Sequence, residues 1–148
     1  MDLSEPAADL LELVSLVVRG ASGNRDLSLT ALSALGSLER MGPRRITALA
    51  AAESVSQPSM TQLVQRLEQR GLVARSSDPA DGRAALVSLT DEGRAALAER
   101  RARGACRIAT LLADLPAEDV LALSEALTAV LPAMRERVGG DSRITDMR

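Results

Sequence analysis

The chain has 148 residues and a formal net charge of −2 at pH 7, with no histidine, no aromatic residue and a single cysteine, Cys106. These absences exclude an internal disulfide, a zinc site built from His and Cys side chains, and any Ser-His or Cys-His catalytic pair. The core has to be packed from aliphatic side chains, which favours helix packed on helix. We therefore expect one mainly α-helical domain with no metal, no cofactor and no enzymatic activity.

The first predicted helix spans residues 6–20, and nearly every residue from Leu10 to Val18 is apolar. A terminal helix with this much apolar surface is difficult to cover inside a small subunit, so the pattern indicates a partner subunit. The apolar run is too short to span a membrane, and it follows acidic rather than basic residues, unlike a signal peptide. We therefore expect a soluble, cytoplasmic protein.

The next predicted elements are short and closely spaced. After a loop at residues 22–26, a second helix is expected to begin near Thr30 as its cap and to end at Gly42-Pro43. Arg44-Arg45 then fits a short strand of a small sheet, and Thr47 is expected to cap a short third helix. These elements lead directly into a fourth helix.

The fourth predicted helix is the most informative stretch of the chain. Ser56 is a suitable N-cap, Pro58 is tolerated only in a first turn, and Gly71 ends the helix. One face is apolar at helical spacing, and the other carries amides and hydroxyls. A Gln amide can pair with two atoms of an adenine edge, and hydroxyls can contact bases or phosphates, so this face is a candidate DNA-binding surface; the alternative is an ordinary exposed helix face. The candidate residues are Gln57, Ser59, Thr61, Gln62 and Gln65.

Two short strands are expected after this helix, one opened by Leu72-Val73 and one spanning Ala85–Leu89, joined by a turn rich in Asp, Pro and Gly. Arg83 stands in this turn, where a basic tip suits the minor groove of DNA; the alternative is a solvated Arg. Residues 40–83 hold seven Arg against four acidic residues, whereas residues 1–39 hold two Arg against six. The positive charge is thus concentrated on the segment expected to lie on DNA.

Two longer helices complete the predicted elements, one from Asp91 to about Leu115 and one from Pro116 to Gly139-Gly140. Cys106 lies in the first of them. It fits a small buried hydrophobic residue, or a redox-sensing thiol beside basic neighbours.

Three motifs carry a family resemblance: the run SQPSMTQLVQRLEQRGLV, the pair Asp81 and Arg83 in the turn, and the following LVSLTDEG. Together they resemble the MarR family of bacterial transcriptional regulators. The resemblance implies a single domain over residues 1–148, with a winged helix-turn-helix lobe at 29–90 and dimerisation helices at 1–21 and 91–140. The fold would be mainly α with a small β wing. The partners would be double-stranded DNA, a second copy of the chain, and a small-molecule effector.

The resemblance also implies roles for individual residues. Arg45, Arg66 and Arg75 are interpreted as contacts to DNA phosphates, which give affinity without sequence information. Asp81 would orient the wing, with Arg66 or Arg83 as its partner; the alternative is a turn-forming Asp. An effector pocket would be aliphatic, and the alternative is a closed core with no ligand. The pocket candidates are Leu16, Leu32, Leu35, Met41 and Leu112.

These patterns predict a sequence-specific DNA-binding regulator, in most of the family a repressor, that binds a pseudo-palindromic operator as a homodimer and is released by an effector. Two alternatives stay open. One is an architectural DNA-binding protein without sequence preference, and the other is a winged-helix module that binds proteins. Arg66, Arg75 and Arg83 together argue against the last, because a lost DNA function should not leave all three.

Overall fold

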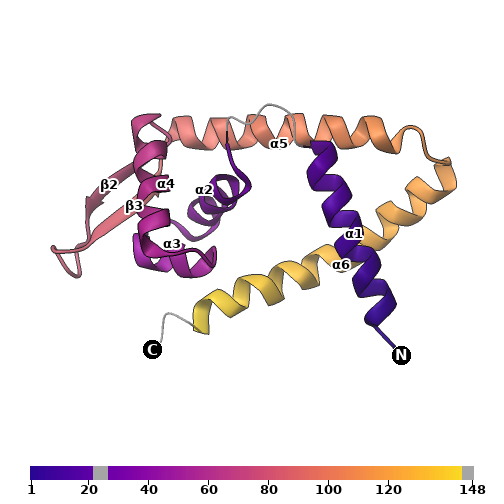
Figure 1. Ribbon diagram of the computed structural model, residues 1–148, viewed down its shortest axis with the longest axis horizontal. Helices are drawn as coiled ribbons and strands as arrows, with labels where there is room; N and C mark the ends of the chain where they lie inside the picture. The colour runs from indigo at the N-terminus through magenta and orange to yellow at the C-terminus, as the bar shows by residue number, and fades with distance from the viewer. Residues whose placement is uncertain (22–26, 145–148) are drawn as a thin grey trace. The chain divides into compact units, whose positions relative to one another are not determined.

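The computed structural model describes residues 1–21 and 27–144, with side chains described as far as Arg137. The predicted loop at residues 22–26 lies outside this range. Figure 1 shows a mainly helical chain with one small antiparallel sheet, which confirms the predicted fold class. In chain order the elements are α1 (Ser4–Ala21), α2 (Leu29–Met41), β1 (Arg44–Arg45), α3 (Ile46–Ala52), α4 (Gln57–Gln69), β2 (Val73–Ser77), β3 (Ala85–Leu89), α5 (Asp91–Leu112) and α6 (Ala117–Ile144).

The chain divides into two compact units. Among the described residues, the central unit comprises residues 27–100 together with residue 144, and the terminal unit comprises residues 1–21 and 101–143. The central unit therefore contains α2, α3, α4 and the sheet, and the terminal unit contains α1 and α6. Helix α5 is continuous across residue 100, so its first half belongs to the central unit and its second half to the terminal unit.

Local capping decides where the helices of the central unit begin. The Ser28 hydroxyl accepts a hydrogen bond from the Ala31 N–H at 3.1 Å, so Ser28 caps α2 and the predicted Thr30 cap is wrong. Helix α3 begins at Ile46 after Arg45, which makes no side-chain capping bond, so the predicted Thr47 cap is also wrong. The predicted Ser56 cap of α4 is confirmed, because its hydroxyl accepts from the Ser59 N–H.

The three strands form one antiparallel sheet in the order β1-β3-β2. Val87 of β3 stands opposite Arg44 of β1 and Arg75 of β2. The strand that the sequence predicted at Arg44-Arg45 is therefore present. Strands β2 and β3 with the turn between them form the wing, and β1 pairs with β3 rather than β2. This register places the segment before α3 beside the middle of β3.

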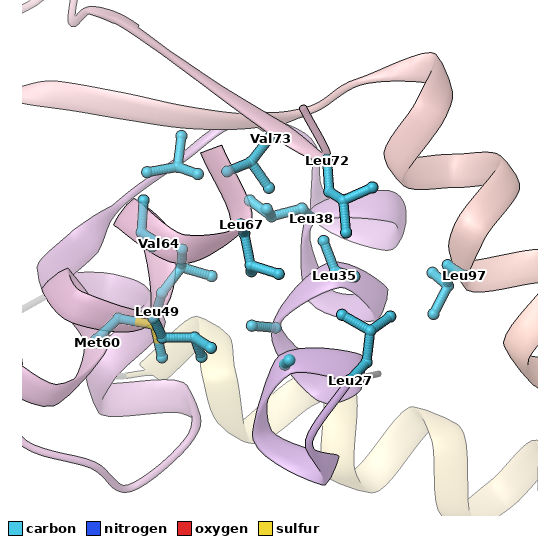
Figure 2. Close-up of a cluster of buried hydrophobic side chains, with 14 of the residues drawn as sticks. Leu27, Leu35, Leu38, Leu49, Met60, Val64, Leu67, Leu72, Val73 and Leu97 are labelled. Carbon is cyan, nitrogen blue, oxygen red and sulfur yellow. The ribbon is translucent and has the colours of Figure 1, made fainter. Parts of the chain in front are cut away.

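The core of the central unit is entirely aliphatic, as Figure 2 shows. Leu35 of α2, Leu49 of α3 and Met60 of α4 are each 0% exposed, and Leu97 of α5 closes the cluster at 1%. Each helix thus contributes at least one fully buried side chain. Burying a Leu or Met side chain stabilises a fold by about 1.5–3 kcal/mol, so this cluster fixes the position of α4.

The terminal unit has no comparable core. None of the side chains described in residues 1–21 and 101–137 is fully buried, although many are apolar. Within this unit α1 approaches α5 closely: a Cβ placed on Gly20 would lie 2.6 Å from Leu111 Cδ1. The predicted end of the last helix at Gly139-Gly140 is wrong, because α6 continues to Ile144. No helix within residues 1–21 and 27–144 is long and apolar enough to cross a membrane.

Candidate nucleic-acid interface

The outer face of α4 is the centre of the candidate interface. Met60, Leu63, Val64 and Leu67 are all buried and hold the inner face against the core. The polar residues proposed to contact DNA point elsewhere. The exposed ones are Gln57, Ser59, Gln62, Gln65 and Arg66, whereas Thr61 is only partly exposed.

Two of the candidate residues, Ser59 and Thr61, make hydrogen bonds at the start of α4. The Ser56 hydroxyl donates to Ser59 Oγ at 2.8 Å, and the Ser59 N–H donates back to Ser56 Oγ at 3.3 Å. The Thr61 hydroxyl donates to the Gln57 carbonyl oxygen at 2.9 Å. Ser59 and Thr61 therefore contribute first to the geometry of the helix start, and the Gln amides are the more available groups.

The turn between β2 and β3 is shaped by Asp81. One of its carboxylate oxygens accepts from the Arg83 N–H at 3.1 Å, and its carbonyl accepts from the Ala84 N–H at 3.0 Å. Of the two partners predicted for Asp81, Arg83 is thus the one it contacts, through the backbone rather than the guanidinium. The Arg83 side chain is exposed, so the turn presents a cation to solvent.

A second carboxylate, Asp78, ties the start of the turn between β2 and β3 to β1. Its Oδ2 accepts from Arg45 Nε at 2.7 Å and lies 2.6 Å from Arg45 Nη2. Its Oδ1 accepts from the Ala80 N–H at 2.9 Å, and the side chain is only 10% exposed. Sequence reasoning missed this pair, because 33 residues separate its members and only the β1–β3 register brings them together.

The pairing changes the interpretation of two of the three proposed phosphate contacts. Arg45 is engaged by Asp78, and Arg75 of β2 pairs with Glu68 of α4 at 3.2 Å. Both arginines therefore fix the wing to neighbouring elements, whatever they contribute to DNA. Arg66, on the last turn of α4, is exposed and fits the phosphate role best of the three.

The proposed effector residues do not share one environment. Leu35 is fully buried and Leu32 packs against the same core, whereas Met41 is 41% exposed. Leu16 and Leu112 belong to the terminal unit. A pocket that includes them stays a prediction.

Cys106 is exposed in this subunit. The expectation that it is a small buried residue is therefore wrong for the chain alone. It lies in the second half of α5, in the terminal unit.

Residues 27–85, which span α2 to the start of β3, match the model of the MarR family. The HTH-type transcriptional regulator Mb0904 of Mycobacterium bovis is 40% identical over 102 residues, which cover 66% of this chain and 71% of the relative. The chain belongs to the MarR family. Proteins of this family are transcriptional regulators and not enzymes.

Other MarR-type proteins agree with this assignment. The HTH-type transcriptional repressor MdtR of Bacillus subtilis is 33% identical over 61% of this chain and 58% of the repressor. The transcriptional regulator Tm0710 of Thermotoga maritima superposes with a TM-score of 0.71 at 28% identity, covering 90% of this chain and 96% of that one. The regulator PcaV of Streptomyces coelicolor, whose structure was solved in complex with its natural ligand, shares the fold with a TM-score of 0.57 at 23% identity, covering 90% and 97% of the two chains.

The Asp78 carboxylate predicts a pH dependence. The Ala80 N–H and the Arg45 guanidinium lower the pKa of Asp78 from its ordinary value of 3.8. A lowered pKa in the folded state stabilises the fold above the ordinary value, and this contribution is lost as the pH falls through the lowered pKa. In urea unfolding followed by circular dichroism, Asp78→Asn should therefore be less stable than wild type near neutral pH, and the difference should shrink below pH 3.8. A difference that stays constant through that range would contradict the ionic origin.

Proposed function

We propose that this MarR-family protein is a homodimeric repressor that binds a pseudo-palindromic operator and is released by a small-molecule effector. In this proposal residues 29–90 form the DNA-binding lobe, and residues 1–21 and 91–140 form the dimerisation helices. The observation that carries the proposal is the outer face of α4, which presents exposed amides above a fixed aliphatic core; in the same unit, the turn between β2 and β3 presents Arg83.

Electrostatics support contact with DNA despite the net charge of −2. The exposed arginines of the central unit include Arg66 and Arg83, and three acidic residues of α4 and the wing turn are already engaged. Asp78 is paired with Arg45, Glu68 with Arg75, and Asp81 with the backbone of its own turn. The charges of Asp78 and Glu68 are balanced by these arginines, so the two carboxylates repel phosphate less than unpaired ones would.

The terminal unit supports the homodimer. Leu11 is 70% exposed, Leu121 60% and Val130 51%, and no described side chain of the unit is fully buried. Apolar surface of this extent on a monomer indicates an interaction site. A twofold dimer would place two copies of α4 about 34–36 Å apart, so that they enter successive major grooves while each Arg83 reaches a minor groove.

Repression and its relief rest on the family relationship. MdtR is named a repressor, and PcaV was solved with a natural ligand. The dimer can bind its operator only when the two α4 helices are spaced to fit successive major grooves. An effector releases DNA only if it binds a dimer with another spacing more tightly than this one. Met41 is 41% exposed and Leu32 is partly buried at the edge of the core, and both are apolar residues that suit such a ligand.

The test is binding to fluorescently labelled DNA from upstream of the protein's own gene, measured by anisotropy at several salt concentrations with random DNA as control. A specific regulator should prefer its site by a factor of about 10³ or more. Equal binding to both DNAs with a steep salt dependence would favour an architectural protein. No binding to either would favour a protein-interaction module.

The wing supplies a second prediction. Arg83→Ala should weaken operator binding by about 1–3 kcal/mol, because the minor-groove contact is lost, without changing the unfolding midpoint. Arg107→Ala is the matched control, since it removes the same charge from the terminal unit. If the two substitutions weakened operator binding equally in the anisotropy assay, Arg83 would contribute only its positive charge and not a specific contact.

A further inference from the structure

We propose that Gln62 and Gln65 are the base-reading residues of α4 and that they select adenine at two positions of each operator half-site. This inference rests on the proposed function, because it specifies which bases the repressor recognises. It depends on three features of the helix: the direction of its buried face, the hydrogen bonds at its start, and the chemistry of its exposed face.

The buried face defines the direction in which α4 can meet DNA. Met60, Leu63, Val64 and Leu67 point into the core. At about 100° per residue, the opposite direction is occupied by Pro58, Gln62, Gln65 and Gln69, all within about 30° of it. All four are exposed.

The other residues of the polar face are turned aside. By the same geometry, Gln57 and Ser59 lie about 90° or more from this direction, and Thr61 and Arg66 lie about 70° from it. Ser59 and Thr61 are also engaged in hydrogen bonds at the helix start. These positions suit the groove walls and the phosphates rather than the base edges.

The position along the helix separates Gln62 and Gln65 from Gln69. In helix-turn-helix proteins the N-terminal residues of the recognition helix contact the bases. Gln69 is the last residue of α4, so it should lie beyond the groove. It is chemically identical to the other two and shares their direction, which makes it a matched control.

The chemistry of the amide selects adenine. The Gln side-chain oxygen accepts a hydrogen bond from the adenine N6 amine, and the Gln amide N–H donates to adenine N7. Guanine instead offers two acceptors, which suit Arg or Lys. No Arg or Lys is among the four residues that lie opposite the buried face of α4. Residues three apart are separated by about 4.5 Å along a helix, and base pairs by about 3.4 Å, so the two adenines should occupy adjacent or next-adjacent pairs.

The experiment is selection of binding sites from a random DNA library by the full-length protein, with wild type, Gln62→Ala, Gln65→Ala and Gln69→Ala in parallel. The wild type should enrich an inverted repeat with two adenines per half-site. Gln62→Ala should lose the preference at one of these positions and Gln65→Ala at the other, and each should weaken binding to the wild-type site about 5- to 150-fold. Gln69→Ala should keep both preferences.

A conservative substitution gives a second test, because it should change which base is preferred, whereas damage to the fold would only weaken binding. Gln62→Glu removes the amide donor and leaves an acceptor that suits the cytosine amine, so the preference at its position should change from adenine to cytosine. An enriched site whose adenines survive both alanine substitutions, or that contains none, would overturn this inference and leave the repressor proposal standing. Enrichment of no site by the wild type would overturn the proposed function and the inference with it.

Discussion

Gly93→Ala should destabilise the central unit by about 3 kcal/mol, near the upper end of the usual cost of overpacking. A Cβ on Gly93 would penetrate the carbonyl oxygen of Leu72 and lie 2.7 Å from Leu89 Cδ1. The Leu72 carbonyl cannot move away freely, because it accepts from the Thr90 N–H at 3.2 Å. Thr90 in turn binds the Gly71 carbonyl and the Gly93 N–H. The start of α5 is thus packed directly against the segment that ends α4.

Urea unfolding followed by circular dichroism at a fixed protein concentration measures this effect. Gly82→Ala is the control, since a Cβ there meets nothing within 4 Å, and it should change the free energy of unfolding by no more than about 0.5 kcal/mol. Equal midpoints for the two variants would mean that α5 can shift away from Leu72 at little cost.

Leu11→Glu should convert the dimer to monomers and abolish operator binding. Leu11 is 70% exposed on α1, on the side of the helix opposite Gly20, where α1 meets Leu111. Burying one leucine contributes about 1.5–3 kcal/mol, and a twofold interface contains the residue twice. The dimer dissociation constant should therefore rise at least about 150-fold, before any cost of burying the new charge.

Sedimentation equilibrium measures the dissociation constant directly. Leu29→Glu is the matched control, because Leu29 is 59% exposed but belongs to the central unit. It should leave the dimer intact. If Leu11→Glu also left it intact, α1 would have to be removed from the proposed interface.

The sequence predicted those elements whose signals are local. The Ser56 cap, the apolar spacing from Met60 to Leu67 and the helix end at Gly71 all lie within one segment, so α4 could be placed closely. The predicted caps Thr30 and Thr47 were wrong because residue type alone does not identify the capping position. Either residue is chemically suitable, and only the backbone shows that Ser28 and Arg45 occupy the capping positions.

Features that depend on the sheet register were beyond sequence reasoning. Asp78 looked like one of several turn residues, and Arg45 looked like a phosphate contact. Their ion pair joins β1 to the start of the turn that follows β2, two segments that are far apart in the sequence. The roles proposed for the DNA-contacting residues themselves remain predictions, as do the boundaries of the DNA-binding and dimerisation segments.

Arg45 has a further consequence for the kinetics of release. It lies opposite Leu86 of β3, it is the residue before α3, and it pairs with Asp78 at the start of the turn between β2 and β3. The wing and the helices of the central unit are therefore expected to move as one rigid body. Contacts in the major and minor grooves should then be lost in a single concerted step, so that dissociation from a half-site follows one exponential rather than a fast wing phase followed by a slow helix phase.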